Sequence, residues 1–263
     1  MLEVINPTLI GGVTAVAVFV GILLALKLGR WLGQRAIASD GRAVQPNVGS
    51  LEGAVFALLG LLIAFTFSGA LQRFDSRRVQ VVQEANSIGT AWSYLDLVPA
   101  SAQPKLRSSF RAYVDARIAA YRALPDIEKA KSALALSREL QGDVWEQAVA
   151  ATRQKDANPA ATIVLMPELQ NMFSLATARL AATQIHPPTV IYQMLIALAL
   201  VAAVLAGYQA AGERGYDWIH KIAFAGIVAA TVYVILDIEY PRLGFVRIDA
   251  IDRVLVDVRE GMK

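Results

Sequence analysis

The most regular pattern of side chains in this sequence lies in the second of four apolar segments. Phe56, Ile63, Phe67 and Phe74 recur at spacings of seven, four and seven residues, which places them on one face of a helix. Around the axis of a symmetric oligomer, such side chains would form a hydrophobic constriction that gates by dewetting. Because phenyl edges are weakly positive, the constriction would not repel anions. The simpler alternative is that these side chains face lipid or a neighbouring helix.

Another face of the same segment carries small residues at a spacing of about four. Small side chains let helix backbones approach closely in lipid, so this ridge predicts a helix-packing surface. Its members are Gly53, Ala57, Gly60, Ala64 and Ser68.

Three cations follow the second apolar segment, namely Arg73, Arg77 and Arg78. They are candidates for a cationic vestibule, and ordinary interfacial anchoring is the alternative.

A polar cluster closes the fourth apolar segment, where Asp237 and Glu239 stand close to Arg242. Charged groups at membrane depth indicate function by default. Their position at the end of the span instead favours a structural ion pair, with Arg242 or Arg73, over ion coordination. His186 precedes two prolines at a helix break, where capping or solvation is the default interpretation.

The composition excludes several kinds of chemistry. The chain has no cysteine and two histidines, which excludes thiol catalysis and argues against a histidine-based zinc site. The sequence has no nucleophile elbow, glycine-rich phosphate loop or paired His-Glu motif. We therefore expect no enzyme activity, no cofactor and no metal. A net charge of +3 is too small to indicate nucleic-acid binding.

The apolar segments predict an all-α integral membrane protein with four transmembrane helices, surrounded by a lipid bilayer. Hydrophobic residues make up 56% of the chain. Their excess is concentrated in residues 9–28, 53–71, 190–211 and 222–236. About 20 apolar residues in a helix cross the hydrocarbon core. The fourth segment reaches this length when its flanks lie in the headgroup zone, to which Trp218 and Tyr240 are suited.

The four spans are expected in two pairs, separated by a charged helical region outside the membrane. The expected organisation is two spans in residues 1–71, a helical extramembrane region in 72–189, two spans in 190–240, and a tail in 241–263. The tight cluster of three arginines after the second span favours a cytoplasmic position for the extramembrane region. The Ala- and Arg-rich composition suggests the plasma membrane of a bacterium.

Helical patterning continues from the second span to Leu97 and stops at Pro99. Glu84 and Asn86 are expected to make polar contacts inside the helical bundle. Further helices are expected over residues 101–124, 126–153 and 167–185. Asp126 is the expected N-cap of the second of these. A short amphipathic helix is expected within residues 247–259, where a strand is the alternative.

Three stretches of the chain resemble a known family. They are GLLIAFTFSGALQRFDSRRVQVVQEANSIGTAW at 60–92, IHPP at 185–188 and DIEYPRLGFVRID at 237–249. Together they are similar to the bestrophin-like membrane domain family, whose layout resembles that of bestrophins, pentameric anion channels with four spans. The resemblance implies that Phe56, Ile63 and Phe67 lie along a pore. The acidic cluster that binds calcium in animal bestrophins has no clear counterpart here, so calcium gating is not predicted.

The leading hypothesis is a homo-oligomeric channel that conducts an inorganic anion through a pore lined by the second span. The alternative is a non-conducting scaffold or sensor whose extramembrane helices, centred on residues 99–162, bind a partner protein. A transporter is a third hypothesis, weakened because the spans lack the broken helices and inverted repeats of many transporter folds.

Overall fold

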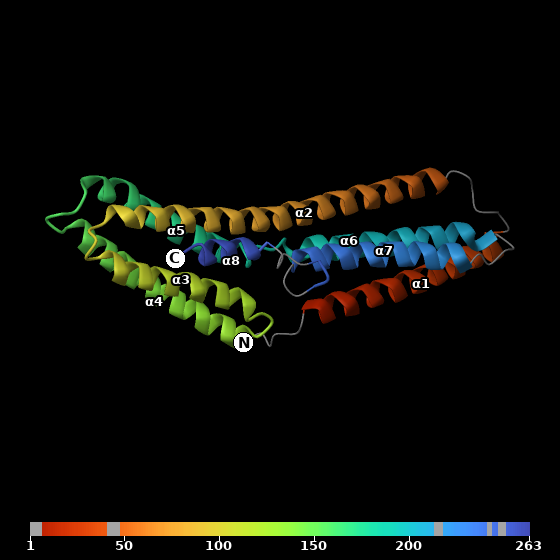
Figure 1. Ribbon diagram of the computed structural model, residues 1–263. Coiled ribbons are helices and arrows are strands. Elements are labelled where there is room, and N and C mark those ends of the chain that lie inside the picture. Colours follow the sequence, from red (N-terminus) through yellow and green to blue (C-terminus); the bar gives the residue numbers. More distant parts are fainter. Residues whose placement is uncertain (1–6, 41–47, 213–217, 241–243, 247–250) are drawn as a thin grey trace. The chain divides into compact units, whose positions relative to one another are not determined.

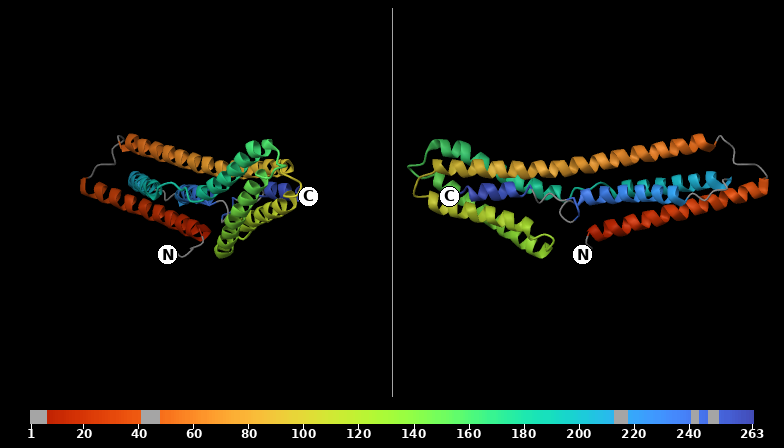
Figure 2. Two further views of the ribbon diagram at one scale, coloured as in Figure 1. Left: turned by 90° about the vertical axis from the view of Figure 1, so that its left-hand side faces the viewer. Right: turned by 45° about the vertical axis from the view of Figure 1, so that its right-hand side comes forward.

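The computed structural model describes residues 7–40, 48–212, 218–240, 244–246 and 251–263 (Figures 1 and 2). Its helices agree with the all-α expectation, and no strand occurs in these residues. The chain divides into two compact units. The first consists of Met1–Arg73 and His186–Phe245, and the second of Phe74–Ile185 and Val246–Lys263.

Four helices are long and apolar enough to cross a membrane, as the sequence predicts. They are α1 (Pro7–Asp40), α2 (Val48–Tyr94), α6 (Thr189–Gln209) and α7 (Trp218–Glu239). The apolar part of α2 belongs to the first unit with the other three, and the remainder of α2 belongs to the second. Within the first unit α1 packs along both α6 and α7 (Figure 1).

The helices α1 and α6 cross with almost no side chain between their backbones. A Cβ atom added at Gly29 would lie 1.9 Å from the carbonyl oxygen of Val204. One added at Gly207 would lie 2.1 Å from the carbonyl oxygen of Leu26. One added at Gly33 would lie 2.6 Å from the carbonyl oxygen of Tyr208. Glycine is therefore required at this crossing, which is the close packing that small residues permit in lipid.

The second unit is a helical bundle around one hydrophobic core. It contains the end of α2, the 3₁₀ turn η1 (Leu95–Leu97), α3 (Gln103–Arg122), α4 (Ile127–Thr152), α5 (Pro159–Ala182) and α8 (Arg253–Glu260). Phe110 and Tyr113 of α3 pack in this core with Leu165 and Leu169 of α5. α3 also packs against α4 and α8.

Capping residues determine where two helices of this bundle begin. Asp126 is the N-cap of α4, as expected, and its carboxylate accepts a hydrogen bond from the Lys129 backbone N–H at 3.1 Å. A further hydrogen bond from the Lys129 side chain lowers the pKa of Asp126. Asn158 caps α5, with Pro159 in its first turn. The expectation that this helix begins near residue 167 is therefore wrong, and Pro167 lies inside α5.

The C-terminal tail belongs to the second unit from Val246 onward. The amphipathic helix expected within residues 247–259 is present as α8, and residues 247–250 lie outside the described part. Leu255 and Met262 are buried in the core of the bundle. The amphipathic pattern therefore predicted the correct element, and the strand alternative does not apply to α8.

Candidate functional site

The apolar part of α2 is the least buried of the four candidate spans. Only 17% of its most apolar stretch is buried within the chain, against 44% for α7 and 28% for each of the other two. Leu59, Thr66 and Ala70 form its buried side. The opposite side is left for lipid, for another copy of the chain, or for the axis of an oligomer.

The small-residue ridge lies on this exposed side of α2. All five residues are exposed: Gly53, Ala57, Gly60, Ala64 and Ser68. A Cβ atom added at Gly53 or Gly60 would meet no described atom within 4 Å. The ridge is therefore directed away from the helices described in its own chain, and its role in helix packing stays a prediction.

The four pore-lining candidates of the sequence have different surroundings. Phe67 is 37% exposed. Phe56 packs edge to face against Phe224 of α7, with ring centroids 5.6 Å apart. Ile63 is partly buried, and so is Phe74, which belongs to the second unit. The stripe thus lies at the border between the buried and exposed sides of α2, and Phe67 is its most accessible member.

Arg77 and Arg78 have partners within the protein. Arg77 is buried and donates hydrogen bonds to the carbonyl oxygens of Ala182, at 3.1 Å, and Ile185, at 3.0 Å, so it caps the end of α5. Arg78 forms an exposed ion pair with Asp75 at 3.2 Å. Their proposed part in a cationic vestibule therefore stays a prediction, and any such role must act alongside these contacts.

Glu239 is the centre of a polar cluster at the end of α7. Its carboxylate is 1% exposed and accepts hydrogen bonds from Arg73 at 2.9–3.1 Å. It also lies 3.3 Å from His186 Nδ1, and the His186 ring packs against Tyr240 with centroids 4.7 Å apart. Arg73 is one of the two partners suggested by the sequence. The other, Arg242, lies outside the described residues.

Asp237 holds the backbone at Phe245, in the described residues 244–246. Its Oδ1 accepts a hydrogen bond from the Phe245 backbone N–H at 2.9 Å. A Cβ atom added at Gly244 would lie 2.2 Å from the same oxygen, so a larger residue there would displace the Asp237 carboxylate. The described residues contain no group of three His, Cys, Asp or Glu suited to a metal ion. The contact of Asp237 with Phe245 supports the structural role that the sequence favours, and that role stays a prediction.

The second unit contains an ionic network of which the sequence indicated one member, Glu84. Asn86 is exposed, so the expectation that it also lies inside the bundle is wrong. The carboxylate of Glu84 is fully buried and accepts hydrogen bonds from Arg117 of α3 and Arg179 of α5, both at 2.7 Å. Arg179 also donates to Asp252 at 2.6 Å, and its guanidinium lies 3.7 Å from the centre of the Tyr121 ring. Two cations and two carboxylates thus balance within the bundle, as burial of charge requires.

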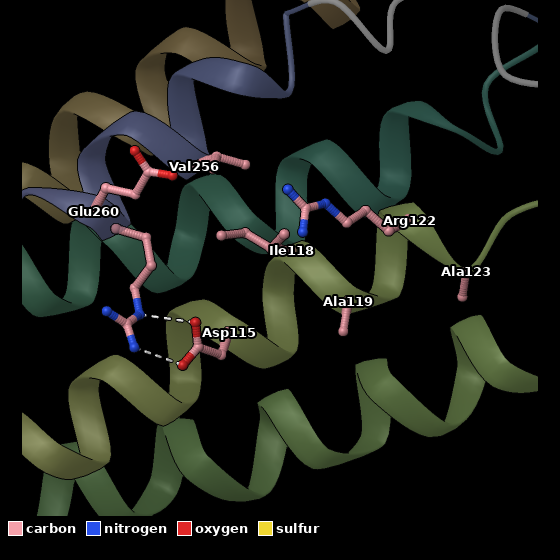
Figure 3. A pocket seen from close by; sticks show the side chains of 8 residues that line it. Asp115, Ile118, Ala119, Arg122, Ala123, Val256 and Glu260 are labelled. Carbon is pink, nitrogen blue, oxygen red and sulfur yellow. Dashed lines mark hydrogen bonds and ion pairs between the residues drawn. The ribbon is translucent and has the colours of Figure 1, made fainter.

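A shallow pocket of about 480 Å³ lies between α3 and α8 (Figure 3). Ile118 and Val256 are among its apolar lining residues. Arg259 of α8 donates two hydrogen bonds to the carboxylate of Asp115 of α3, both at 2.8 Å. This bidentate pair and the contact between Arg179 and Asp252 hold the C-terminal segment on the bundle.

The sequence matches the model of the Bestrophin-like domain over residues 20–251. The chain belongs to the Bestrophin-like family. This confirms the resemblance drawn from the three sequence stretches. No curated protein matches the sequence.

Solved structures of a bacterial bestrophin homologue from Klebsiella pneumoniae share the fold of this Bestrophin-like chain. One of them has a TM-score of 0.65 at 13% identity, and the alignment covers 91% of this chain and 97% of that one. Two single-residue variants of the homologue give TM-scores of 0.66 and 0.67 at 13% and 12% identity. Their alignments cover 91% and 93% of this chain, and 98% and 99% of theirs.

Proposed function

We propose that this protein is a homo-oligomeric ion channel in which the apolar part of α2 lines the pore. The observation that carries the proposal is the exposed side of α2, since this span is only 17% buried within its own chain. A symmetric oligomer can place such a face around its axis. The family membership supports the same function, because bestrophins are channels with this layout.

The proposed constriction is centred on Phe67. Phe67 is exposed, whereas Phe56 is engaged with Phe224 and Ile63 is partly buried one turn away. One phenyl ring from each copy would narrow the path and exclude water when the pore is closed. Ile63 would extend this apolar section by one turn.

The proposed preference for anions rests on the weakly positive edges of the phenyl rings. The three arginines after the apolar part of α2 contribute less to this preference. Arg73 is paired with Glu239 and Arg78 with Asp75. Arg77 is buried and bound to backbone carbonyl oxygens at the end of α5. We further propose that the second unit is cytoplasmic and that the membrane is a bacterial plasma membrane, on the charge and composition grounds given by the sequence.

The test is ion flux into proteoliposomes that contain the purified full chain, measured separately for chloride and for potassium. Phe67→Ala is expected to change the rate or the voltage dependence of flux. Phe65→Ala is the matched control, because Phe65 is also exposed on α2 but points about 160° away around the helix. A change with Phe65→Ala alone would move the pore to the other face of α2.

Absence of flux from folded, oligomeric protein would overturn the channel and favour a scaffold or sensor. In that case the extramembrane helices of the second unit would be the functional surface. Flux of potassium without chloride would retain the channel and overturn the anion preference.

A further inference from the structure

The outward face of α1 carries a continuous row of exposed aliphatic side chains. Its members are 45–64% exposed: Val13, Val16, Val20, Leu24 and Leu28. Ile22 and Leu26, on the other side of the helix, are buried against the unit. Because α1 is one of the four candidate spans, the exposed row is the side on which hydrocarbon chains of the bilayer can lie.

This row ends in two cations and a tryptophan. Lys27, Trp31 and Arg35 follow one another at intervals of four residues, and all three are exposed on the same side of α1. Tryptophan is suited to the headgroup zone of a bilayer, and lysine and arginine extend their charged ends into that zone. The end of the aliphatic row therefore coincides with residues of the membrane interface.

The arginine of this group is oriented toward the membrane span. The guanidinium carbon of Arg35 lies 4.0 Å from the centre of the Trp31 ring, a favourable contact of a cation with an aromatic face. Side chains on a helix point toward its N-terminus, so Arg35 is directed back toward Lys27. Lys27 lies about 6 Å from Trp31 along the axis on the other side, and its flexible stem reaches the level of Trp31 by extending its charged end into the headgroup zone.

Neither cation is neutralised within the described part of the chain. No described carboxylate forms an ion pair with Lys27 or Arg35, whereas the exposed cations Lys129 and Lys131 of α4 are both paired. Positive charge at the border of an apolar, membrane-facing surface attracts an anion from the same layer. In a bilayer, the anion held at that depth is the phosphodiester of a lipid.

We propose that Lys27, Trp31 and Arg35 bind the headgroup of an anionic phospholipid, with its acyl chain along Val20 and Leu24. The two cations contact the phosphodiester from opposite sides, and the contact with the Trp31 ring holds the Arg35 guanidinium in place. A zwitterionic lipid would bring its own positive group close to these cations, so the site favours lipids with net negative charge. This assignment concerns α1 and is independent of any conduction along α2.

The experiment is a titration of the purified full chain in detergent with phosphatidylglycerol, and separately with phosphatidylcholine of the same acyl chains, followed by native mass spectrometry. Phosphatidylglycerol is expected to bind more tightly. Each cation near an anionic headgroup contributes about fivefold to affinity. The double variant Lys27→Gln with Arg35→Gln is therefore expected to weaken phosphatidylglycerol binding by about thirtyfold and to leave phosphatidylcholine binding unchanged.

The matched control is Lys105→Gln with Arg138→Gln, which removes the same two residue types from exposed positions of the second unit. It is expected to leave lipid binding unchanged. Equal binding of the two lipids by the wild type would overturn the proposal, and so would full retention of phosphatidylglycerol by the Lys27/Arg35 variant. A variant that changes the mass of the oligomer without changing the number of bound lipids would show that this face binds another copy instead.

Trp31 provides a second measurement that does not depend on the double variant. Phosphatidylglycerol brominated in its acyl chains is expected to quench the tryptophan fluorescence of the wild type more than brominated phosphatidylcholine does. The difference is expected to disappear in Trp31→Phe, which retains an aromatic ring beside Arg35. A difference of the same size in Trp31→Phe would assign the lipid to another part of the chain.

Discussion

Glu84 and Arg179 stand 95 positions apart in the chain and are joined by a hydrogen bond of 2.7 Å. The same carboxylate accepts a hydrogen bond from Arg117 through its other oxygen. Each of the three side chains is at most 4% exposed. The Glu84 carboxylate on α2 thus neutralises Arg117 of α3, and it shares Arg179 of α5 with the carboxylate of Asp252. The association of these three helices therefore depends on the charge of Glu84.

Glu84→Gln is expected to destabilise the second unit strongly. The substitution keeps the size of the side chain but leaves two buried guanidinium groups without their common counter-charge. Breaking a buried pair in this way costs about 3 kcal/mol, which lowers the melting temperature of a unit of this size by roughly 8–15 °C. Trp92 and Trp145 border the core of the unit, so the fluorescence of these residues in the full chain reports its unfolding.

Asp75→Asn is the control for this prediction. It also removes a carboxylate of α2 from an ion pair with an arginine, but Asp75 and Arg78 are 57% and 47% exposed. Exposed pairs contribute about 0.5 kcal/mol or less, so the melting temperature should barely change. Equal effects of the two substitutions would show that the buried network has no special role in stability.

Tyr113 should make the second unit sensitive to alkaline pH. Burial raises the pKa of its hydroxyl well above the usual range, and nearby Glu84 raises it further while Arg117 lowers it. A group whose pKa is higher in the folded state contributes its full stability below the pKa of the unfolded chain, about 10. That contribution falls as pH rises above 10, by up to about 1.4 kcal/mol for each pH unit.

Tyr113→Phe removes this titration. At pH 7 the variant is expected to be at least as stable as the wild type, because the Tyr113 hydroxyl is buried without a hydrogen-bond partner among the described residues. Above pH 10 its melting temperature should fall less steeply. Tyr121→Phe is the comparison, since Tyr121 accepts a hydrogen bond from Arg117 and its loss should destabilise at pH 7. Parallel pH profiles for the wild type and Tyr113→Phe would contradict the assignment.

The sequence predicted the helices of the second unit because their boundaries are local. Helical periodicity and the capping side chain of Asp126 act within one or two turns. Pro167 misled the prediction for α5, because a proline usually ends or begins a helix. Here the Asn158 cap starts the helix earlier, and Leu165 and Leu169 bury apolar side chains on both sides of the proline. That burial offsets the missing backbone hydrogen bond.

The pairing of residues from different helices could not be predicted in the same way. Glu84 was expected to make contacts inside the bundle, but its partner Arg179 follows 95 positions later, and no local pattern joins them. The glycines that lie at a helix crossing were equally hard to predict from the sequence. The spacing of small residues indicated the ridge that contains Gly60 for helix packing, whereas the closest backbone approach described is at Gly29 and Gly207. Spacing identifies a small-residue face but does not identify the helix that meets it.

Gly207→Ala is expected to separate α1 from α6. The added methyl group would lie 2.1 Å from the carbonyl oxygen of Leu26, a backbone atom that cannot move independently of its helix. Overpacking of this kind costs about 1–3 kcal/mol, which should lower the melting temperature of the purified chain. Gly226→Ala provides the comparison, because a methyl group there meets no described atom within 4 Å. An unchanged melting temperature for Gly207→Ala would show that this crossing adapts freely.

Gly60→Leu should change the assembly of the protein rather than the fold of one chain. A side chain at Gly60 points into open space within the single chain, with no described atom within 4 Å of an added Cβ atom. In the proposed oligomer, however, the ridge is directed toward other copies, where a leucine prevents close approach of the helices. The expected result is a smaller or mixed oligomer by light scattering in detergent, with the melting temperature of the second unit retained.

Gly226→Leu tests whether any added leucine has this effect, since Gly226 also faces open space but lies on α7. An oligomer of unchanged mass for Gly60→Leu would show that the ridge faces lipid or the pore axis, and that contacts between copies lie elsewhere on the chain.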